Sequence, residues 1–416
     1  MLATNNAPLN SPSKVTLPVA KSARRNHSPQ DNRPYILYLI DQFTGIQAGG
    51  AERALLNITR HLPQERFRCS VATFAFSPDA HLGELFSCPV TVFPLRRTYD
   101  ANALKIAWQL RRLIRSQGVS LVHTFFETSD LWGGAIAKLS GCPLIISSRR
   151  DMGILRKPKH NYAYRLSRSW VDRVLTVSDQ VRSFVIEQDG MDPAKIETLY
   201  SGVDLQLVDA PRNSSLARAN LGLEEASHVI TTVGNIRRVK GLDVFIRAAA
   251  RVVRELPHAV FLIVGNTLED KHRLELEGLR DDLGLSRNLR FTGGQNDVQQ
   301  YLDASDVFCL LSRSEGFSMA LLEAMARSLP SVVTDVGGNS EAIEEGESGF
   351  VVKNEDSETA ALRILQLLHG PDLRRKMGLQ ARQRVNDRFT MEAMIGNLTR
   401  IYDQLLLSRG ISICTP

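Results

Sequence analysis

Short apolar runs, rich in β-branched and aromatic residues, alternate along this chain with segments whose apolar residues recur at helical spacing. The run PYILYLIDQF (34–43) is followed, after a Gly-Gly pair, by the helical pattern AERALLNITRHL (51–62). The alternation restarts at HVITTVGNI (228–236) and is still visible at SVVTDVGG (331–338). Strands that alternate with helices predict parallel sheets covered by helices, and therefore an α/β fold.

A break in this alternation lies near 205–227, where no strand pattern is present and turn-forming residues gather. The length of 416 residues suits two domains. We predict two Rossmann-like, doubly wound parallel-sheet domains, at 34–208 and 209–388, which face each other across a central cleft. Ligands of such sheets bind at the carboxyl ends of the strands, so the cleft is the expected site. Residues 1–33, rich in Asn, Ser, Pro and Arg, are predicted to form a disordered tail.

Several classes of protein are disfavoured by patterns that the sequence lacks. The five cysteines are scattered without a Cys-x-x-Cys pair, which indicates reduced cytosolic thiols rather than a disulfide framework or a zinc site. No Gly-x-Gly-x-x-Gly follows the first strand of either half, and no Gly-x4-Gly-Lys-Ser/Thr loop occurs, which disfavours a nicotinamide enzyme and a P-loop kinase. No apolar run approaches the ~18 residues of a spanning helix, so we expect a cytoplasmic protein.

Charge is distributed unevenly along the chain. The first 200 residues carry ten more basic than acidic residues, whereas the remainder carries four more acidic than basic ones. A basic half attracts anions such as phosphorylated substrates, anionic lipid or nucleic acid. An exposed basic face without any partner is the alternative.

Two Gly-Gly turns follow predicted strands. Gly49 and Gly50, in AGGAER (48–53), let the backbone approach an anion at the start of a helix, although a tight strand-to-helix turn explains the pair equally well. Gly338, in TDVGGNSEAI (334–343), lies in a similar turn that exposes backbone N–H groups. Both turns are candidates for holding phosphate.

A basic loop, GNIRRVKG (234–241), lies where the first strand of the second half ends. Its cations are Arg237, Arg238 and Lys240. Two or three cations at a strand end suit a diphosphate, whose charge they offset through charge-assisted hydrogen bonds. An exposed loop without a ligand is the alternative.

Two acids flank the start of an apolar run in SEGFSMALLEAMA (314–326). Ser318 is expected to cap a helix that runs to about residue 327. Glu315 would then lie on the preceding loop, and Glu323 on the helix, facing the cleft. A carboxylate can accept two neighbouring hydroxyls, as sugars present them, so the pair suits two sugar rings on either side of a diphosphate. For Glu323 alone, a surface acid on an amphipathic helix is the default interpretation.

Together these stretches resemble the retaining GT-B glycosyltransferases of family 4. The resemblance rests on Glu315-x7-Glu323, GNIRRVKG, TDVGGNSE, GGAER and SGVD (201–204), and it covers about residues 34–408. The segment 389–410 resembles the final helices of that family, which cross back onto the N-terminal domain. The resemblance implies transfer of a sugar from a nucleoside diphosphate sugar to a glycan or lipid-linked glycan, in polysaccharide or glycolipid assembly.

The resemblance also implies roles for single residues. Glu323 would hold the ribose hydroxyls, Glu315 would contact the transferred sugar and Lys240 would bind the diphosphate. The implied donor-binding residues are Gly49, Gly50, Arg237, Lys240, Glu315, Gly316, Phe317, Ser318, Glu323 and Gly338. No cofactor or metal is implied, because the family lacks an Asp-x-Asp motif and none occurs here.

Two positions depart from the family pattern. Asn235 stands where an arginine is common, and Arg237 or Arg238 would have to supply that charge. A histidine or His-x-His often ends the fourth strand of the N-terminal domain, and here LVHTFFE has His123 but Phe125 two places later. His123 is a third predicted catalytic residue, beside Lys240 and Glu315. A histidine that belongs to the core is the alternative.

The acceptor is expected to meet the basic N-terminal half. The residues chosen for an acceptor or an anionic membrane surface are Arg149, Arg150, Arg156, Lys157 and Lys159. The basic amphipathic pattern at 103–117 could lie on a membrane as well, although its apolar face more commonly belongs to a core. We therefore expect a protein on the inner face of the membrane.

Two other classes remain open at this point. An epimerase or hydrolase of nucleotide sugars would share the fold. A non-enzymatic anion-binding protein would use the basic half, but it leaves Glu315, Glu323 and the Gly-Gly turns unexplained. Nucleic acid is not an expected partner, because aromatic stacking platforms and known motifs are missing.

Overall fold

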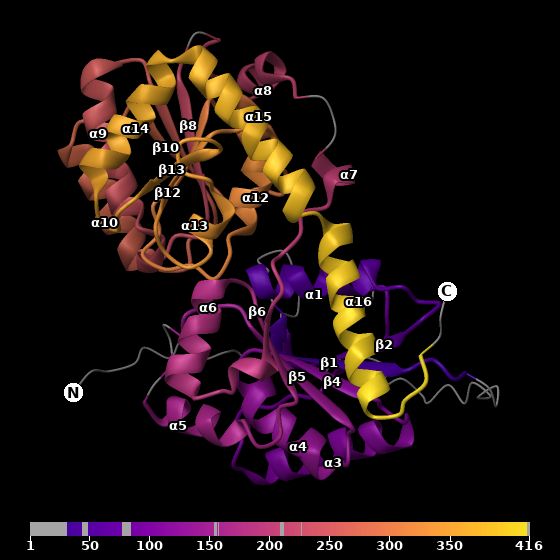
Figure 1. Cartoon of the computed structure of the whole chain (residues 1–416). Helices are drawn as coiled ribbons and strands as arrows, with labels where there is room; N and C mark the ends of the chain where they lie inside the picture. The colour runs from indigo at the N-terminus through magenta and orange to yellow at the C-terminus, as the bar shows by residue number, and fades with distance from the viewer. Residues whose placement is uncertain are drawn as a thin grey trace, which may run out of the picture.

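The computed structural model describes residues 31–43, 49–76, 85–153, 156, 158–208, 212–225 and 227–413. Two parallel sheets, each covered by helices, lie one above the other in Figure 1. This arrangement confirms the predicted α/β class with two doubly wound domains. The predicted tail at 1–33 lies almost wholly outside the described residues, and so does the predicted boundary at 208/209 on its C-terminal side.

The N-terminal sheet has seven strands in the order β3-β2-β1-β4-β5-β6-β7. All of its pairings are parallel. The strands are β1 (Tyr35–Phe43), β2 (Arg68–Phe76), β3 (Val90–Val92), β4 (Leu121–Phe125), β5 (Leu144–Arg149), β6 (Arg173–Thr176) and β7 (Ile196–Thr198). The helices between them are α1 (Gly50–His61), α3 (Ala101–Ser116), α4 (Gly134–Leu139), α5 (Pro158–Ser167) and α6 (Asp179–Phe184), with π-helical turns η2 (Ser129–Gly133) and η3 (Val185–Asp189) and a short 3-10 turn η4 (Pro193–Lys195).

The C-terminal sheet has six strands in the order β10-β9-β8-β11-β12-β13, again all parallel. The strands are β8 (Val229–Val233), β9 (Val260–Val264), β10 (Leu289–Gly293), β11 (Val307–Leu310), β12 (Ser331–Thr334) and β13 (Gly349–Val352). The helices that follow β7 in the chain are α7 (Leu205–Val208), α8 (Ser214–Asn220), η5 (a 3-10 turn, Arg238–Lys240), α9 (Leu242–Glu255), α10 (Asp270–Asp282), α11 (Gln299–Ala304), α12 (Met319–Ala326), α13 (Asn339–Ala342), α14 (Ser357–His369) and α15 (Pro371–Arg388). The last helix, α16 (Met391–Ser408), packs against the N-terminal domain.

Strand β1 shows why this sequence needs helices on both faces of its sheet. Its successive apolar side chains point to opposite faces, and nearly all of them are fully buried. Ile36 and Tyr38 belong to a core with α1 and α16, whereas Leu37 and Leu39 belong to a second core with α3 and α4. A continuous apolar run of this kind predicts a parallel strand buried on both sides.

The chain crosses between the domains twice, and the two crossings are hydrogen-bonded to each other. Val203 N donates to Phe389 O, and Met391 N donates to Val203 O, both at 2.9 Å. A Cβ on Gly202 would lie 2.4 Å from the Thr390 carbonyl oxygen, so only glycine permits this approach. Beyond the crossing, α16 runs down over the N-terminal domain, as Figure 1 shows in yellow.

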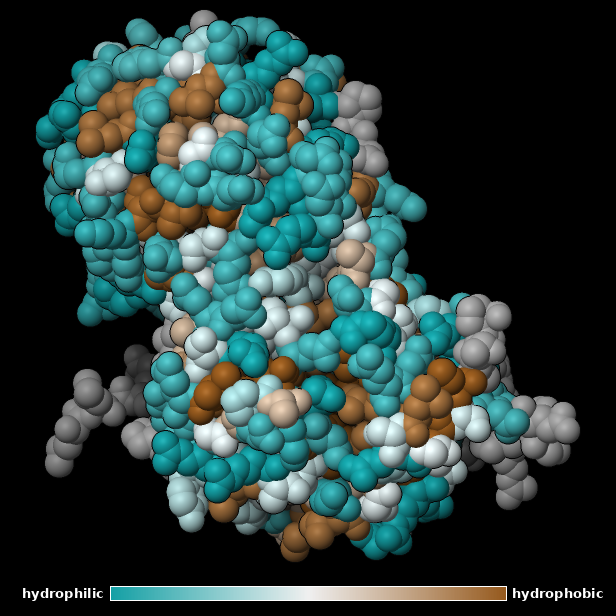
Figure 2. Space-filling view, viewed as in Figure 1, coloured by the Kyte–Doolittle hydropathy of each residue, from teal (hydrophilic) through white to brown (hydrophobic). Residues whose placement is uncertain are grey.

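The surface is mainly polar, with scattered apolar patches. Figure 2 shows one such patch at the lower edge of the N-terminal domain, where Figure 1 places α3. No helix in the described part of the chain combines the length and the apolar character that crossing a membrane requires.

Candidate active site

The predicted diphosphate loop folds as η5 and brings Lys240 to the edge of the C-terminal sheet. Lys240 Nζ lies 2.6 Å from Glu315 Oε1, and the Ser312 hydroxyl donates to the same oxygen at 2.7 Å. Gly241 has φ +59°, and a Cβ there would lie 2.0 Å from a backbone carbonyl oxygen. The loop can therefore turn into α9 only with glycine at this position. Two residues predicted to touch the donor are thus in direct contact.

The second acid of the opening stretch, Glu323, lies on α12 as expected. Ser318 caps that helix by accepting a hydrogen bond from Leu321 N at 3.3 Å. Burial raises the pKa of the Glu323 carboxyl, and the Arg53 guanidinium partly offsets this effect. Arg53 Nη1 lies 4.0 Å from Glu323 Oε1 and comes from α1, at the start of the N-terminal domain. Glu323 therefore lies on the side of the C-terminal domain that faces α1, rather than on an outer surface.

Close backbone contacts bring three loops together beside Glu315. Gly338 N donates to Gly316 O at 2.8 Å. A Cβ on Gly337, which has φ +54°, would lie 1.8 Å from the Glu315 carbonyl oxygen. A Cβ on Gly316 would lie 2.0 Å from the carbonyl oxygen of Arg150, in the N-terminal domain. The second Gly-Gly turn therefore meets the Glu315 loop at the junction of the two domains.

Further contacts between the domains come from Glu341, on α13 just after this turn, and from Phe317. The Glu341 carboxylate accepts hydrogen bonds from Asp179 N at 2.8 Å and Gln180 N at 2.9 Å, at the start of α6. The Tyr200 ring lies 5.2 Å from that of Phe317, centroid to centroid. The predicted donor residue Phe317 is thus part of the domain junction, with only 8% of its surface exposed.

The remaining donor residues are placed as follows. Gly49 precedes α1 and Gly50 opens it, and a Cβ on either glycine would meet no atom of the described residues within 4 Å. The described part of the chain therefore does not require glycine at these two positions. Arg237 is exposed at the start of η5, and Arg238 pairs with Glu275 at 2.5 Å. Lys240 N donates a hydrogen bond to Arg237 O at 3.0 Å, so the backbone joins the two residues while the Arg237 side chain is exposed.

His123 does not lie at the cleft. It is fully buried in β4, and its ring nitrogens lie 2.7 Å from the Tyr402 hydroxyl and 2.8 Å from the Ser148 hydroxyl. The Tyr402 hydroxyl in turn donates to that of Tyr38 at 3.2 Å. Burial lowers the pKa of His123 to about 3. His123 is therefore a core histidine, which was the alternative interpretation of the sequence. Its contact with Tyr402 connects α16 to the sheet.

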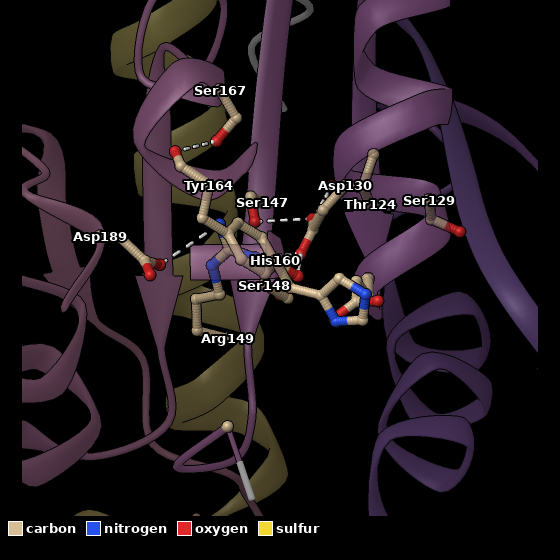
Figure 3. Close-up of polar contacts among 12 residues, drawn as sticks. Thr124, Ser129, Asp130, Ser147, Ser148, Arg149, His160, Tyr164, Ser167 and Asp189 are labelled. Carbon is tan, nitrogen blue, oxygen red and sulfur yellow. Dashed lines mark hydrogen bonds and ion pairs between the residues drawn. The ribbon is translucent and has the colours of Figure 1, made fainter. Parts of the chain in front are cut away.

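The basic cluster after β5 is largely an internal ion-pair network (Figure 3). Arg149 and Asp130, whose side chains are 3% and 2% exposed, pair directly. Arg149 Nη2 also lies 3.8 Å from Asp189, which Arg156 contacts at 2.7 Å. The Arg149 guanidinium lies 3.7 Å from the centroid of the Tyr164 ring. Arg149 and Arg156 therefore do not face an acceptor or a membrane as predicted, because their charges are satisfied inside the domain.

The other predicted acceptor residues divide into two groups. Arg150 donates to the Ser201 hydroxyl at 2.7 Å, beside the interdomain crossing. Lys157 lies outside the described residues, and Lys159 lies in α5 with its side chain outside them.

Comparisons with known proteins agree with this geometry. Residues 48–207 match the family model "Glycosyltransferase Family 4", and residues 213–384 match "Glycosyl transferases group 1". The Escherichia coli UDP-Gal:alpha-D-GlcNAc-diphosphoundecaprenol alpha-1,3-galactosyltransferase is 25% identical over 375 residues, which cover 86% of this chain and 95% of that protein. The Bacillus anthracis N-acetyl-alpha-D-glucosaminyl L-malate synthase is 32% identical over 211 residues, which cover 51% and 54%. The crystal structure of Anabaena HepE in complex with UDP-glucose superimposes with a TM-score of 0.78 at 22% identity, over 89% of this chain and 99% of that one.

Two facing parallel-sheet domains, with paired acids and a lysine at their junction, define a glycosyltransferase of the GT-B fold. The chain belongs to the family of group 1, or family 4, glycosyltransferases, and the two family models together cover most of its length. The predicted membership and class of enzyme are thereby confirmed.

Three residues at the junction were missed by the sequence interpretation. Arg53 and Glu341 both lay inside quoted motifs, GGAER and TDVGGNSEAI, but no role was assigned to them. Their contacts cross between the domains, which a motif of one strand, turn and helix does not reveal. Ser312, which donates a hydrogen bond to Glu315, is the last residue of the run VFCLLS (307–312) that predicts a strand, and a hydroxyl at a strand end was a signal that could have been used.

Proposed function

We propose that this enzyme is a retaining, metal-independent glycosyltransferase that moves a sugar from a nucleoside diphosphate sugar to a glycan or lipid-linked glycan. One observation carries the proposal: the Lys240–Glu315 pair lies beside the Gly337–Gly338 turn. The cation and the turn suit a diphosphate, while Glu315 and Glu323 suit the two sugar rings that flank it. HepE was solved with UDP-glucose and the E. coli relative is named for UDP-galactose, so UDP sugars are the donors to test first.

The chemistry follows from this arrangement. In a retaining transfer the acceptor hydroxyl attacks on the face from which the nucleotide departs, and a phosphate oxygen of the leaving group can take its proton. The protein then contributes positioning and stabilisation of the charge on the departing diphosphate. Lys240 and the turn amides would supply the latter, without a side-chain nucleophile. The epimerase and hydrolase alternatives are not favoured, since the E. coli relative, which spans most of the chain, is named as a galactosyltransferase.

The donor site predicts a nucleotide-dependent rise in Tm. At about 100 times its Kd, a nucleotide contributes about 2.7 kcal/mol to the stability of the folded state. We expect UDP to raise Tm equally with and without EDTA, and Glu323→Ala to remove the shift. Glu358→Ala, which changes an acid that is 77% exposed on α14, should keep it. No shift with UDP, GDP, ADP or CMP would refute the donor site, and a shift abolished by EDTA would refute metal independence.

We propose further that the enzyme works at the inner face of the membrane and that α3 is the surface that meets anionic lipid. The inner face of α3 joins the core through Ile106 and Leu110. Its outer face exposes 75% of Leu104 and 59% of Trp108, and the Arg112 guanidinium lies 5.6 Å from the Trp108 ring centroid. Apolar and basic side chains on one exposed helix face are typical of interfacial helices.

A vesicle-pelleting assay tests this surface. The double variant Leu104→Ser, Trp108→Ala is expected to lower binding to anionic vesicles at least about tenfold, because it removes two apolar side chains that would enter the interface. Leu362→Ser, at an exposed leucine of α14, is the matched control and should bind normally. Equal pelleting by both variants, or equal pelleting with neutral vesicles, would contradict the proposal.

A further inference from the structure

Cys69 lies in β2, and Cys88 lies two residues before its neighbour β3 begins. In the ladder between β2 and β3, Val71 is the partner of Val90, and Val71 N donates to Pro89 O at 2.9 Å. Cys69 and Cys88 each lie two residues before this pair, so continuing the same register past the end of β3 places them opposite each other. Strands in a sheet lie about 4.8 Å apart, within the range of Cα separations that a disulfide spans.

The two side chains pack against the same hydrophobic core, which α1 and α16 cover. The Cys88 thiol hydrogen-bonds to the Cys69 sulfur, and this bond lowers the pKa of Cys69, since it stabilises the thiolate. Both cysteines are partly exposed, whereas Cys142 and Cys309 are buried.

We propose that Cys69 and Cys88 form a modification site, a dithiol that a low-molecular-weight disulfide such as oxidised glutathione converts into an intrachain disulfide. The Cys69 thiolate attacks one sulfur of the glutathione disulfide, which forms a mixed disulfide and releases one glutathione thiolate. The Cys88 sulfur, on losing its proton, then attacks the Cys69 sulfur and releases the second glutathione. The protein loses two hydrogens, and one oxidised glutathione becomes two reduced ones.

The position of the pair determines what the bond would change. Cys69 lies at the start of β2, at the edge of the sheet opposite to the carboxyl ends that face the donor site. The bond would tie the short edge strand β3 to β2 and close a loop of about 20 residues in the unfolded chain. We therefore expect a more stable protein with unchanged transfer activity.

The experiment uses the full chain with the additional change Cys414→Ser, incubated with oxidised glutathione under native conditions, then alkylated, digested and analysed by mass spectrometry. We expect a Cys69–Cys88 linked peptide at least tenfold more abundant than any other pairing, and a rise in Tm of at least about 3 °C that dithiothreitol reverses. In Cys88→Ser, Cys69 should accumulate the glutathione adduct, whereas in Cys69→Ser, Cys88 should react at least tenfold more slowly.

Three results would overturn the proposal. One is no linked peptide at equilibrium with excess oxidised glutathione. Another is a link that forms only in urea, which would show that the folded chain holds the sulfurs apart. The last is equal reaction of Cys142 or Cys309, which would show that accessibility rather than pairing selects the site.

Discussion

Replacing Arg149 with methionine is expected to lower the free energy of unfolding by about 3–5 kcal/mol. The reason is that Asp130, whose side chain is 2% exposed, would lose its guanidinium partner, and Asp189 would keep only Arg156. Removing one partner of a buried pair leaves a charge without compensation, and that desolvation cost accounts for most of the loss. Urea unfolding followed by tryptophan fluorescence measures it, because all three tryptophans lie in the N-terminal domain.

The matched control is Arg400→Met on α16. Arg400 pairs with Glu197 near the same domain, but its side chain is 49% exposed. Water and salt screen such a pair, so a loss of at most about 1 kcal/mol is expected. Equal losses for the two variants would show that the Arg149 network is not buried as described. The double variant Arg149→Met, Asp130→Asn should recover part of the stability.

Replacing Lys240 with alanine is expected to lower kcat/KM for the donor at least tenfold. A charge-assisted hydrogen bond contributes about 1.5–3 kcal/mol, and in the proposed donor site this one would meet the negative charge that develops on the departing diphosphate. Steady-state kinetics with the nucleotide sugar identified by thermal shift provide the measurement. The change also removes the partner of Glu315, so Tm must be recorded alongside.

Lys376→Ala, at an exposed lysine of α15, is the control for the loss of one positive charge, and it should keep normal kinetics. Lys240→Arg should recover part of the activity, because it restores the cation. Near-normal turnover by Lys240→Ala in a stably folded sample would contradict the assignment of Lys240 to the donor site, independently of the roles of the other residues.

The sequence was sufficient for the fold because the fold depends on local periodicity. The continuous apolar runs predicted buried strands such as β1, and Ser318 was the expected cap of α12. Within the site, Lys240, Glu315 and Gly338 come together because each lies at the carboxyl end of a strand of one sheet. Parallel sheets bring such ends to a common edge whatever the loops contain.

Contacts between distant elements could not be predicted in the same way. Arg149 was predicted to be a surface cation. Asp130 and Asp189, which neutralise its charge, lie in two π-helical turns that no sequence motif predicts. His123 was assigned to the cleft because it precedes a strand end, but its side chain points to the face that α16 covers. The scattered cysteines gave no sign of a pair, because Cys69 and Cys88 come together only through the pairing of β2 with β3, which their spacing in the sequence does not reveal.

The contact of Glu341 has a mechanical consequence. The backbone N–H groups at the start of α6 can bind an anion, and here they bind the Glu341 carboxylate. The segment that ends in this carboxylate begins at the Gly337–Gly338 turn, where the donor diphosphate would lie. These five residues would thus connect the proposed donor site at one end to the N-terminal domain at the other. If phosphate binding displaces the turn, we expect the displacement to pass through Glu341 to the start of α6, so this segment would couple the donor site to the N-terminal domain.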